Sequence, residues 1–421
     1  MSDKLQDFLE EGQVEVIDTQ SEETEAPIPA APNKPKRRKK RRLKPWARVV
    51  KWIGISILAF LLVVVLAFLT IFYSPFFPTL RDRYILMTYK TSNPWLCTTF
   101  FTQEQIDAAF ERNSVVAPEG ETDPDLVAPG GNGEGEGNDE PTPDPITFST
   151  SEKYQGKVIF EENGVQILEF SGKNPGGGKY TARLIQVLDP SRVFLGLTNN
   201  FVEPNTPDAT GFSGKGQTIG EFIDTNNAIC GINAGCWNDP KGIGSGGLPK
   251  DIIIKDGVIK QYDNLERHNI IGINKDNVLV LGNFSNEEII ANNIRDGIAW
   301  EPFLIVNGKK AEASGVAGGY DPRSAIGQRA DGAILLLVVD GGATYLTRGI
   351  DGVNFEFLMD VMWEFGAVNA SNIDGGTSSS MGLKVDGKGK IINTVCNSEI
   401  AHRGRYLNTT WLVKDVPADA Q

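Results

Sequence analysis

Two residue types that often build metal and redox sites are scarce in this chain of 421 residues. It has only two histidines, His268 and His402, and four cysteines. Cys230 and Cys236 are spaced too widely for a zinc knuckle. A lone histidine is usually an ordinary surface or core residue, so neither histidine is assigned a catalytic role. The sequence therefore predicts no cofactor and no metal ligands, and it leaves the need for a divalent cation open.

Charge is absent from one long stretch of the chain. No charged residue occurs from Trp52 to Leu80, and Ile53 to Tyr73 is almost wholly apolar. A helix of that length spans the hydrocarbon core of a bilayer. No small-residue cleavage site follows it. We therefore predict one uncleaved transmembrane helix within residues 49–77.

A basic cluster at Lys34–Lys44 lies directly before this span, whereas few basic residues follow it. Such clusters also occur in nucleic-acid-binding segments. Beside an apolar span, however, a basic cluster is typical of the cytoplasmic side of a membrane helix. The prediction is a single-pass protein of the cell membrane with no nucleic-acid partner. Residues 1–48 would form a disordered cytoplasmic tail, and the main domain would be extracellular.

The whole chain has a formal net charge of -13. Differences in composition divide the part of the chain that follows the span into three segments. We predict that residues 78–113 form an extracytoplasmic stalk. Thr102 begins a capping box, and a short amphipathic helix follows it in the sequence. Residues 114–145 are rich in Gly, Pro, Asp and Glu, which predicts a flexible acidic linker. The domain that follows, 146–416, is long enough to bury one core.

Strand patterns outnumber helical patterns in this domain. Short apolar runs bounded by turn residues occur at 180–188, 193–197, 252–254, 278–281 and 303–306. Ala333–Val339 is continuously apolar, which is typical of a central strand covered on both faces. Helical patterns are limited to residues 219–224, 287–292 and 355–365. Because strands and helices do not alternate regularly, we predict an α+β fold with a mixed β-sheet core and few helices.

All four cysteines lie beyond the membrane span, on the predicted outer side, where disulfides are permitted. They are Cys97, Cys230, Cys236 and Cys396. Four cysteines allow three pairings, and the sequence does not choose among them. The oligomeric state is equally open.

Several apolar runs end in polar, glycine-rich turns. Taken singly, each turn is typical of an ordinary connection, since Asp-Gly is a common hairpin turn. Loops at strand ends can nevertheless bring distant residues together. We therefore predict that one cleft collects two carboxylates, two arginines, an amide and a hydroxyl, namely Asp340, Asp374, Arg323, Arg405, Asn233 and Ser378.

The longest of these loops runs from Asp374 to Ser380 and contains two glycines followed by four hydroxyl residues. Glycines let the backbone turn sharply and approach a ligand, and N–H groups in a tight turn form an anion-binding nest. One arginine guanidinium can donate two parallel hydrogen bonds to two oxygens of a phosphate. A carboxylate can transfer a proton or attack an anomeric carbon. This residue set suits a sugar oxygen or a phosphate oxygen as the ligand.

The order of these motifs resembles the phosphodiester glycosidase family over about residues 175–415. The segments that carry the resemblance are Ile-Asn-Ala-Gly at Asn233, Pro-Arg-Ser-Ala-Ile-Gly at Arg323, Val-Val-Asp-Gly at Asp340, Asn-Ile-Asp-Gly-Gly-Thr-Ser-Ser at Asp374, and Arg405 before the last strand. The resemblance implies a hydrolase that cleaves a sugar from a phosphodiester at the anomeric carbon. For a membrane-anchored bacterial member, the implied substrate is a sugar phosphate or a surface glycopolymer.

The resemblance also implies roles for individual residues. Asp374 is the first choice for the catalytic carboxylate, Asp340 is its partner or the second choice, and Asn233 binds a sugar hydroxyl or a phosphate oxygen. Phosphate binding falls to Arg323, Arg405, Gly375, Gly376, Thr377 and Ser378. The family often has arginine where this chain has Gly342, and Arg348 is the residue expected to replace it.

Two alternatives stay open beside the hydrolase. One is a non-catalytic protein that binds a surface polysaccharide, and the other is a protein of exopolysaccharide assembly. Paired carboxylates favour the enzyme, because a pure binding protein does not need them. The arginine missing after Asp340 favours binding. The sequence names neither the sugar nor its aglycone, and it does not decide between retention and inversion at the anomeric carbon.

Overall fold

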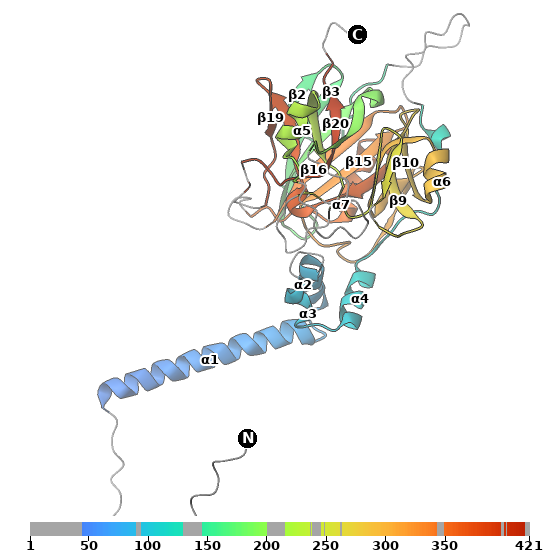
Figure 1. Cartoon of the computed structure of the whole chain (residues 1–421). Helices are drawn as coiled ribbons and strands as arrows, with labels where there is room; N and C mark the ends of the chain where they lie inside the picture. The colour runs from blue at the N-terminus through green and yellow to red at the C-terminus, as the bar shows by residue number, and fades with distance from the viewer. Residues whose placement is uncertain are drawn as a thin grey trace, which may run out of the picture. The chain divides into compact units, whose positions relative to one another are not determined.

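The computed structural model describes residues 44–89, 94–128, 145–199, 215–235, 237, 246–247, 249–261, 263–342, 349–396, 400 and 402–416. Within these ranges strands outnumber helices (Figure 1), and the α+β prediction is confirmed. Neighbouring strands pair antiparallel. The described part of the chain adds an isolated parallel bridge between Lys179 and Ile350.

An eight-stranded sheet carries the strand that the sequence predicts to be central. The strand order is β13 (Lys309–Lys310), β12 (Phe303–Val306), β17 (Ala367–Ile373), β15 (Arg323–Arg329), β16 (Ile334–Asp340), β4 (Lys179–Val187), β3 (Val165–Lys173) and β2 (Lys157–Glu162). The continuous apolar run of the sequence forms β16, and all seven of its residues are buried. It lies inside the sheet, as an apolar strand covered on both faces should.

Two five-stranded sheets share a core with the central sheet. One has the order β10 (Leu279–Phe284), β9 (His268–Asn274), β11 (Ile294–Ala299), β7 (Ile252–Lys255) and β8 (Val258–Gln261). The other has the order β19 (Lys388–Ile391), β18 (Met381–Val385), β6 (Ala228–Asn233), β20 (Thr409–Lys414) and β5 (Val193–Leu197). Leu336, Ile271 and Trp411, one from each sheet, belong to a single buried cluster. Full burial of each such side chain contributes about 1.5–3 kcal/mol, so this cluster holds the three sheets together.

Three helices of the domain match the helical patterns in the sequence. They are α5 (Ile219–Thr225), α6 (Asn286–Ala291) and α7 (Phe355–Glu364). The apolar side of α7 packs on the central sheet, where Leu358 and Met362 join Leu337 in a second core cluster. The α7 pattern ends at Gly366, whose φ of 89° lies in the left-handed region that glycine favours after a helix.

Part of the segment predicted as a flexible linker is ordered against the domain. β1 (Val115–Val116) pairs with β14 (Glu312–Ala313). Further along, the N–H groups of Thr122 and Ala128 donate to backbone carbonyls of the domain, and Val127 is buried. The prediction is therefore corrected for residues 115–128, because composition does not reveal that strand edges of the domain offer backbone partners. Residues 129–144 lie outside the described ranges.

The stalk folds into three short helices, α2 (Pro78–Tyr89), α3 (Trp95–Thr98) and α4 (Gln103–Arg112). The capping box predicted at Thr102 is present, with reciprocal hydrogen bonds between Thr102 and Gln105. Ile85, Cys97 and Ile106 are fully buried together with Phe101. The stalk therefore has a small apolar core of its own.

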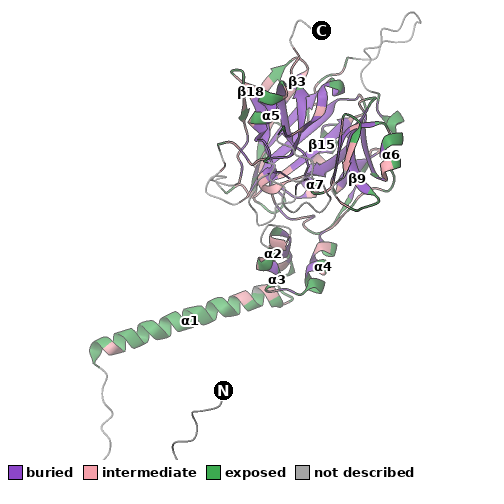
Figure 2. Cartoon of the chain, viewed as in Figure 1, coloured by how far each residue is buried: buried purple, intermediate pink, exposed green. Residues whose placement is uncertain are grey.

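A single long helix, α1 (Pro45–Tyr73), precedes the stalk. Its apolar side chains are exposed along nearly the whole helix (Figure 2). Residues Pro45–Thr70 are long and apolar enough to cross a membrane, and no other helix of the described residues meets that test. The helix is compatible with the predicted single-pass anchor. The predicted tail falls mainly on residues 1–43, outside the described ranges.

No disulfide joins the three cysteines that the structure describes. Cys97 lies in the stalk core, Cys230 is buried on β6, and Cys396 is half-buried. The Sγ atom of Cys396 lies 3.7 Å from the hydroxyl oxygen of Thr377. Cys236 lies outside the described residues, so the pairing question stays as the sequence left it.

Candidate functional site

Three of the predicted loops meet at one edge of the central sheet. β15 begins at Arg323 and lies between β16, which ends at Asp340, and β17, which ends at Ile373. Because β15 is antiparallel to both neighbours, the ends of β16 and β17 share the edge where β15 begins. Two strand spacings separate Asp340 from the β17 end, roughly 10 Å. The topology thus brings together segments that are far apart in the sequence.

A cavity of about 1050 Å³ opens beside this edge. From the central sheet, its wall includes Asp374, Gly375, Gly376, Arg323 and Asp321. From the sheet that contains β7 and β9, it includes Lys250, Asp251 and His268. The cavity therefore combines carboxylates, cationic side chains and a close approach of backbone, which is the usual character of a ligand site.

Asp374 is a carboxylate of the cavity wall whose pKa is shifted toward neutrality. Burial raises its pKa to about 6, although the hydrogen bond from Ser378 and the positive charges of Arg405 and Lys250 act to lower it. The side chain is still partly exposed. A carboxyl group that titrates near neutrality can exchange a proton at physiological pH.

The loop after Asp374 is held by backbone hydrogen bonds, one to Pro322 and one within the loop. The Gly376 N–H donates to the Pro322 carbonyl oxygen (2.9 Å), and the Ser378 N–H donates to Gly375 (3.2 Å). A side chain at Gly375 would meet the Pro322 oxygen at 2.9 Å, and Gly376 has a φ of 60°. Both glycines are therefore required by the backbone. Gly376 and Thr377 are partly exposed, while Ser378 is buried, so the N–H groups predicted to bind phosphate are partly used inside the protein.

Asp340 has a closed environment instead. Its side chain is 1% exposed and forms an ion pair with Arg183 at 2.9 Å. Oδ1 also accepts hydrogen bonds from the Asn393 amide (3.0 Å) and the Thr394 N–H (3.2 Å). Burial raises the pKa of Asp340, whereas Arg183 and these hydrogen bonds oppose the rise. Asp340 is not among the residues that line the cavity.

Asn233 joins two sheets at the base of the Asp374 loop. It is fully buried, and its Nδ2 donates to the Asp374 carbonyl oxygen at 2.6 Å. Its Oδ1 accepts from the Ser324 hydroxyl (2.8 Å) and the Ser380 N–H (3.1 Å). With its amide engaged in this way, Asn233 fixes the position of the Asp374 backbone.

The predicted arginines have different surroundings. Arg323 lines the cavity, stacks on Phe355 with 4.1 Å between guanidinium carbon and ring centroid, and donates to the Gly318 carbonyl at 2.6 Å. Its Nη2 lies 3.5 Å from Asp321. Arg405 is half-buried and stacks on Trp237 at 4.7 Å. Arg348 lies outside the described residues.

Sequence reasoning did not single out several groups of this cavity. Asp321 precedes the Pro-Arg motif, and burial raises its pKa against the nearby charges of Arg323 and Arg83. Lys250 lines the cavity as well, and its charge acts on Asp374. Asp251 and His268 belong to no motif that the sequence offers. The only signal for them is a polar residue at the start of a buried strand or directly before it.

The chain is similar to known proteins in sequence. Residues 226–414 match the model of the phosphodiester glycosidase family. The SPbeta prophage-derived uncharacterized protein YomE of Bacillus subtilis (strain 168) is 25% identical over 218 residues, which are 49% of this chain and 29% of YomE. The chain thus matches less than a third of that relative's length.

Two solved structures are also similar to the chain. The catalytic domain of zebrafish N-acetylglucosamine-1-phosphodiester alpha-N-acetylglucosaminidase, auto-inhibited by its pro-peptide, is 19% identical and covers 63% of this chain and 89% of its own, with a TM-score of 0.46. A hypothetical protein from Synechocystis is 14% identical and covers 62% of this chain and 63% of its own, with a TM-score of 0.40.

Proposed function

Because residues 226–414 match the phosphodiester glycosidase family, we propose that this protein hydrolyses the bond between a sugar's anomeric carbon and a phosphodiester, outside the cytoplasm. The observation that carries the proposal is the position of Asp374. It lies in the wall of the cavity with a pKa of about 6, beside glycines that let a ligand approach.

The chemistry of the bond indicates what the cavity must provide. Cleavage at the anomeric carbon builds positive charge on the sugar ring, and the phosphate is already a good leaving group. The site needs a carboxylate near the ring and cations near the phosphate. Asp374 supplies the carboxylate, which activates water or stabilises the ring charge. Arg323 and Lys250, which line the same cavity, are placed to hold phosphate.

The other predicted residues take supporting roles in this proposal. Asn233 holds the Asp374 backbone, and Asp340 with Arg183 anchors the neighbouring strand end. Arg405 acts on Asp374 through its charge. The loop that contains Thr377 and Ser378 would lie beside the bound phosphate. Arg348 stays a predicted phosphate ligand.

The proposed location rests on the apolar helix and the basic cluster before it. One span with basic residues on its N-terminal side favours a cytoplasmic N-terminus and an extracellular domain. The substrate class that fits this location is a sugar phosphate or a surface glycopolymer. Protease added to intact, wall-stripped cells should remove the domain, and complete resistance until the membrane is broken would contradict this orientation.

The central experiment measures free sugar released from a panel of methyl esters of sugar 1-phosphates by the full-length protein in nonionic detergent. Asp374→Asn should lower kcat by roughly a hundredfold or more while the fold persists. Wild-type kcat/KM should rise with pH through about 6, because the ionised carboxylate is the active form. Asp276→Asn, which changes an exposed carboxylate, should turn over normally.

Two results would contradict the proposal. Near-normal turnover by folded Asp374→Asn would remove Asp374 from the chemistry. Binding of a surface polysaccharide by the wild type without any turnover of the panel would favour the non-catalytic alternative.

A further inference from the structure

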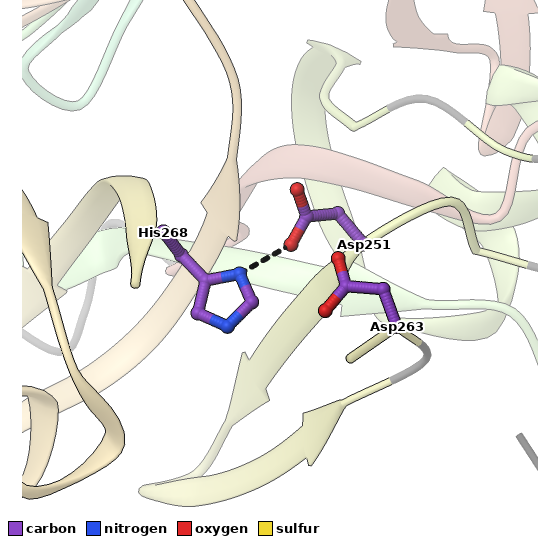
Figure 3. Close-up of side chains that lie close together, drawn as sticks. All are labelled: Asp251, Asp263 and His268. Carbon is purple, nitrogen blue, oxygen red and sulfur yellow. Dashed lines mark hydrogen bonds and ion pairs between the residues drawn. The ribbon is translucent and has the colours of Figure 1, made fainter. Parts of the chain in front are cut away.

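Three side chains that come from separate turns gather on the sheet that contains β7, β8 and β9. Asp251 directly precedes β7, Asp263 follows β8, and His268 begins β9. Each offers one ligand atom, and these atoms lie within 4.8 Å of one another. Both carboxylates point toward the imidazole ring (Figure 3). In this sheet β8 pairs with β7, and β11 lies between β7 and β9. The sheet thus brings the residues together, although 17 positions separate Asp251 from His268.

The imidazole of His268 is buried and only partly satisfied. The residue is 1% exposed, and its Nδ1 lies 2.6 Å from Asp251 Oδ1. Its Nε2 has no hydrogen-bond partner among the residues that the structure describes. Buried polar atoms of side chains usually have a partner, so this nitrogen is an exception. His268 is among the residues that line the cavity.

The charge of the cluster points to the same kind of ligand. Two carboxylates beside one imidazole carry a net negative charge whether or not the imidazole is protonated. Asp251 lines the same cavity as Asp374 and Arg323. A divalent cation would neutralise the carboxylates and take Nδ1 of His268, the nitrogen that faces Asp251, as a third ligand.

We propose that Asp251, Asp263 and His268 bind one divalent transition-metal ion, of which Zn²⁺ is the best match, in the wall of the cavity. One imidazole nitrogen and two carboxylate oxygens suit Zn²⁺ better than Ca²⁺, which prefers oxygen ligands alone. Ligand atoms around tetrahedral zinc lie roughly 3.4 Å apart, so the three side chains need only small movements to close on the ion.

Three protein ligands leave a fourth position open, as in zinc sites that bind water or substrate. Two of the three ligands line the cavity, so the open position would face it. There the ion would supply a Lewis acid for a phosphate oxygen or for water. Metal binding itself does not depend on the proposed glycosidase activity, and it can be measured without substrate.

The experiment titrates metal-depleted, full-length protein in nonionic detergent with Co²⁺, followed by visible absorption, and with Zn²⁺, followed by calorimetry. One ion should bind per chain. Asp263→Asn should weaken binding by more than about tenfold, since even outer partners of metal ligands contribute that much. Glu266→Gln is the matched control, because it removes an exposed negative charge three residues along the chain and should bind as the wild type does.

His268→Gln should abolish binding, and circular dichroism shows whether it folds. If it does not fold, Asp263→Asn decides the question, because Asp263 is half-buried and its loss leaves the Asp251–His268 hydrogen bond intact. The proposal is overturned if the wild type takes up no metal at millimolar concentration, or if Asp263→Asn binds as tightly as the wild type. A thiolate-to-cobalt charge-transfer band would place the ion on cysteine and overturn it as well.

Discussion

The strand ends at Asp340 and Asp374 share the local sequence Asp-Gly-Gly and have opposite environments. Asp340 is sealed beneath the surface by Arg183, Asn393 and Thr394. Asp374 lines a cavity and titrates near pH 6. Asp340 ends β16 and Asp374 follows β17, the two strands that flank β15 on the same sheet. The difference shows that Asp-Gly-Gly specifies a turn, whereas the neighbouring sheets decide whether its carboxylate faces protein or ligand.

Asn233 illustrates how this division arises. It extends from the end of β6 in another sheet and anchors the carbonyl of Asp374. The Asp340 side is instead covered by Asn393, which follows β19. Each carboxylate is thus assigned its environment by a residue more than 50 positions away in the sequence.

The largest expected effect is on stability at the sealed carboxylate. Asp340→Asn places an amide donor against the Arg183 guanidinium and removes the negative partner of a buried charge, so the free energy of unfolding should fall by about 3 kcal/mol. Urea unfolding of the full-length protein, followed by tryptophan fluorescence, measures it. Adding Arg183→Gln should restore part of the loss, because no charge is then stranded. A loss near zero would mean that Asp340 is not sealed.

A smaller effect, of opposite sign, is expected at the open carboxylate. Folded protein keeps the Asp374 proton up to about pH 6, whereas the unfolded chain releases it near 3.8. Between these values the folded state binds more protons, so wild-type stability falls as pH rises and stays lower above about 6. Asn does not titrate. The free energy of unfolding of Asp374→Asn, relative to that of the wild type, should therefore be about 1 kcal/mol higher at about pH 7 than at about pH 4. This value allows for the partial exposure of Asp374.

Urea unfolding of both proteins at the two pH values tests this prediction. The comparison uses the change with pH, because loss of the Ser378 hydrogen bond affects both pH values alike. Equal differences at the two pH values would show that Asp374 has an ordinary pKa, and the contrast with Asp340 would then lose its electrostatic basis.

The smallest effect is expected at the second partner of Arg183. Glu169 faces Arg183 across β3 and β4, with 2.7 Å between Oε2 and Nη2, and its side chain is 36% exposed. Solvent screens such a pair, so Glu169→Gln should cost about 0.5 kcal/mol in the same urea assay. A loss as large as that of Asp340→Asn would show that the surface carboxylate, and not Asp340, neutralises Arg183.

Much of the fold was predictable because its signals are local. The apolar run of β16, the capping box at Thr102 and the pattern of α7 with Gly366 each depend on residues a few positions apart. The linker prediction failed over 115–128, because its backbone partners lie on the domain. Local composition contains no record of such distant partners.

By itself, the sequence determined the apolar helix, the α+β class and the loops in which the candidate site lies, since periodicity and turn chemistry act over short distances. The packing of the folded chain is what opens Asp374 to the cavity and seals Asp340. It alone placed Asp251, Asp263 and His268 together. The physical reason is that a side chain's surroundings are set by strand register and by the packing of one sheet on another, which join residues far apart in the chain.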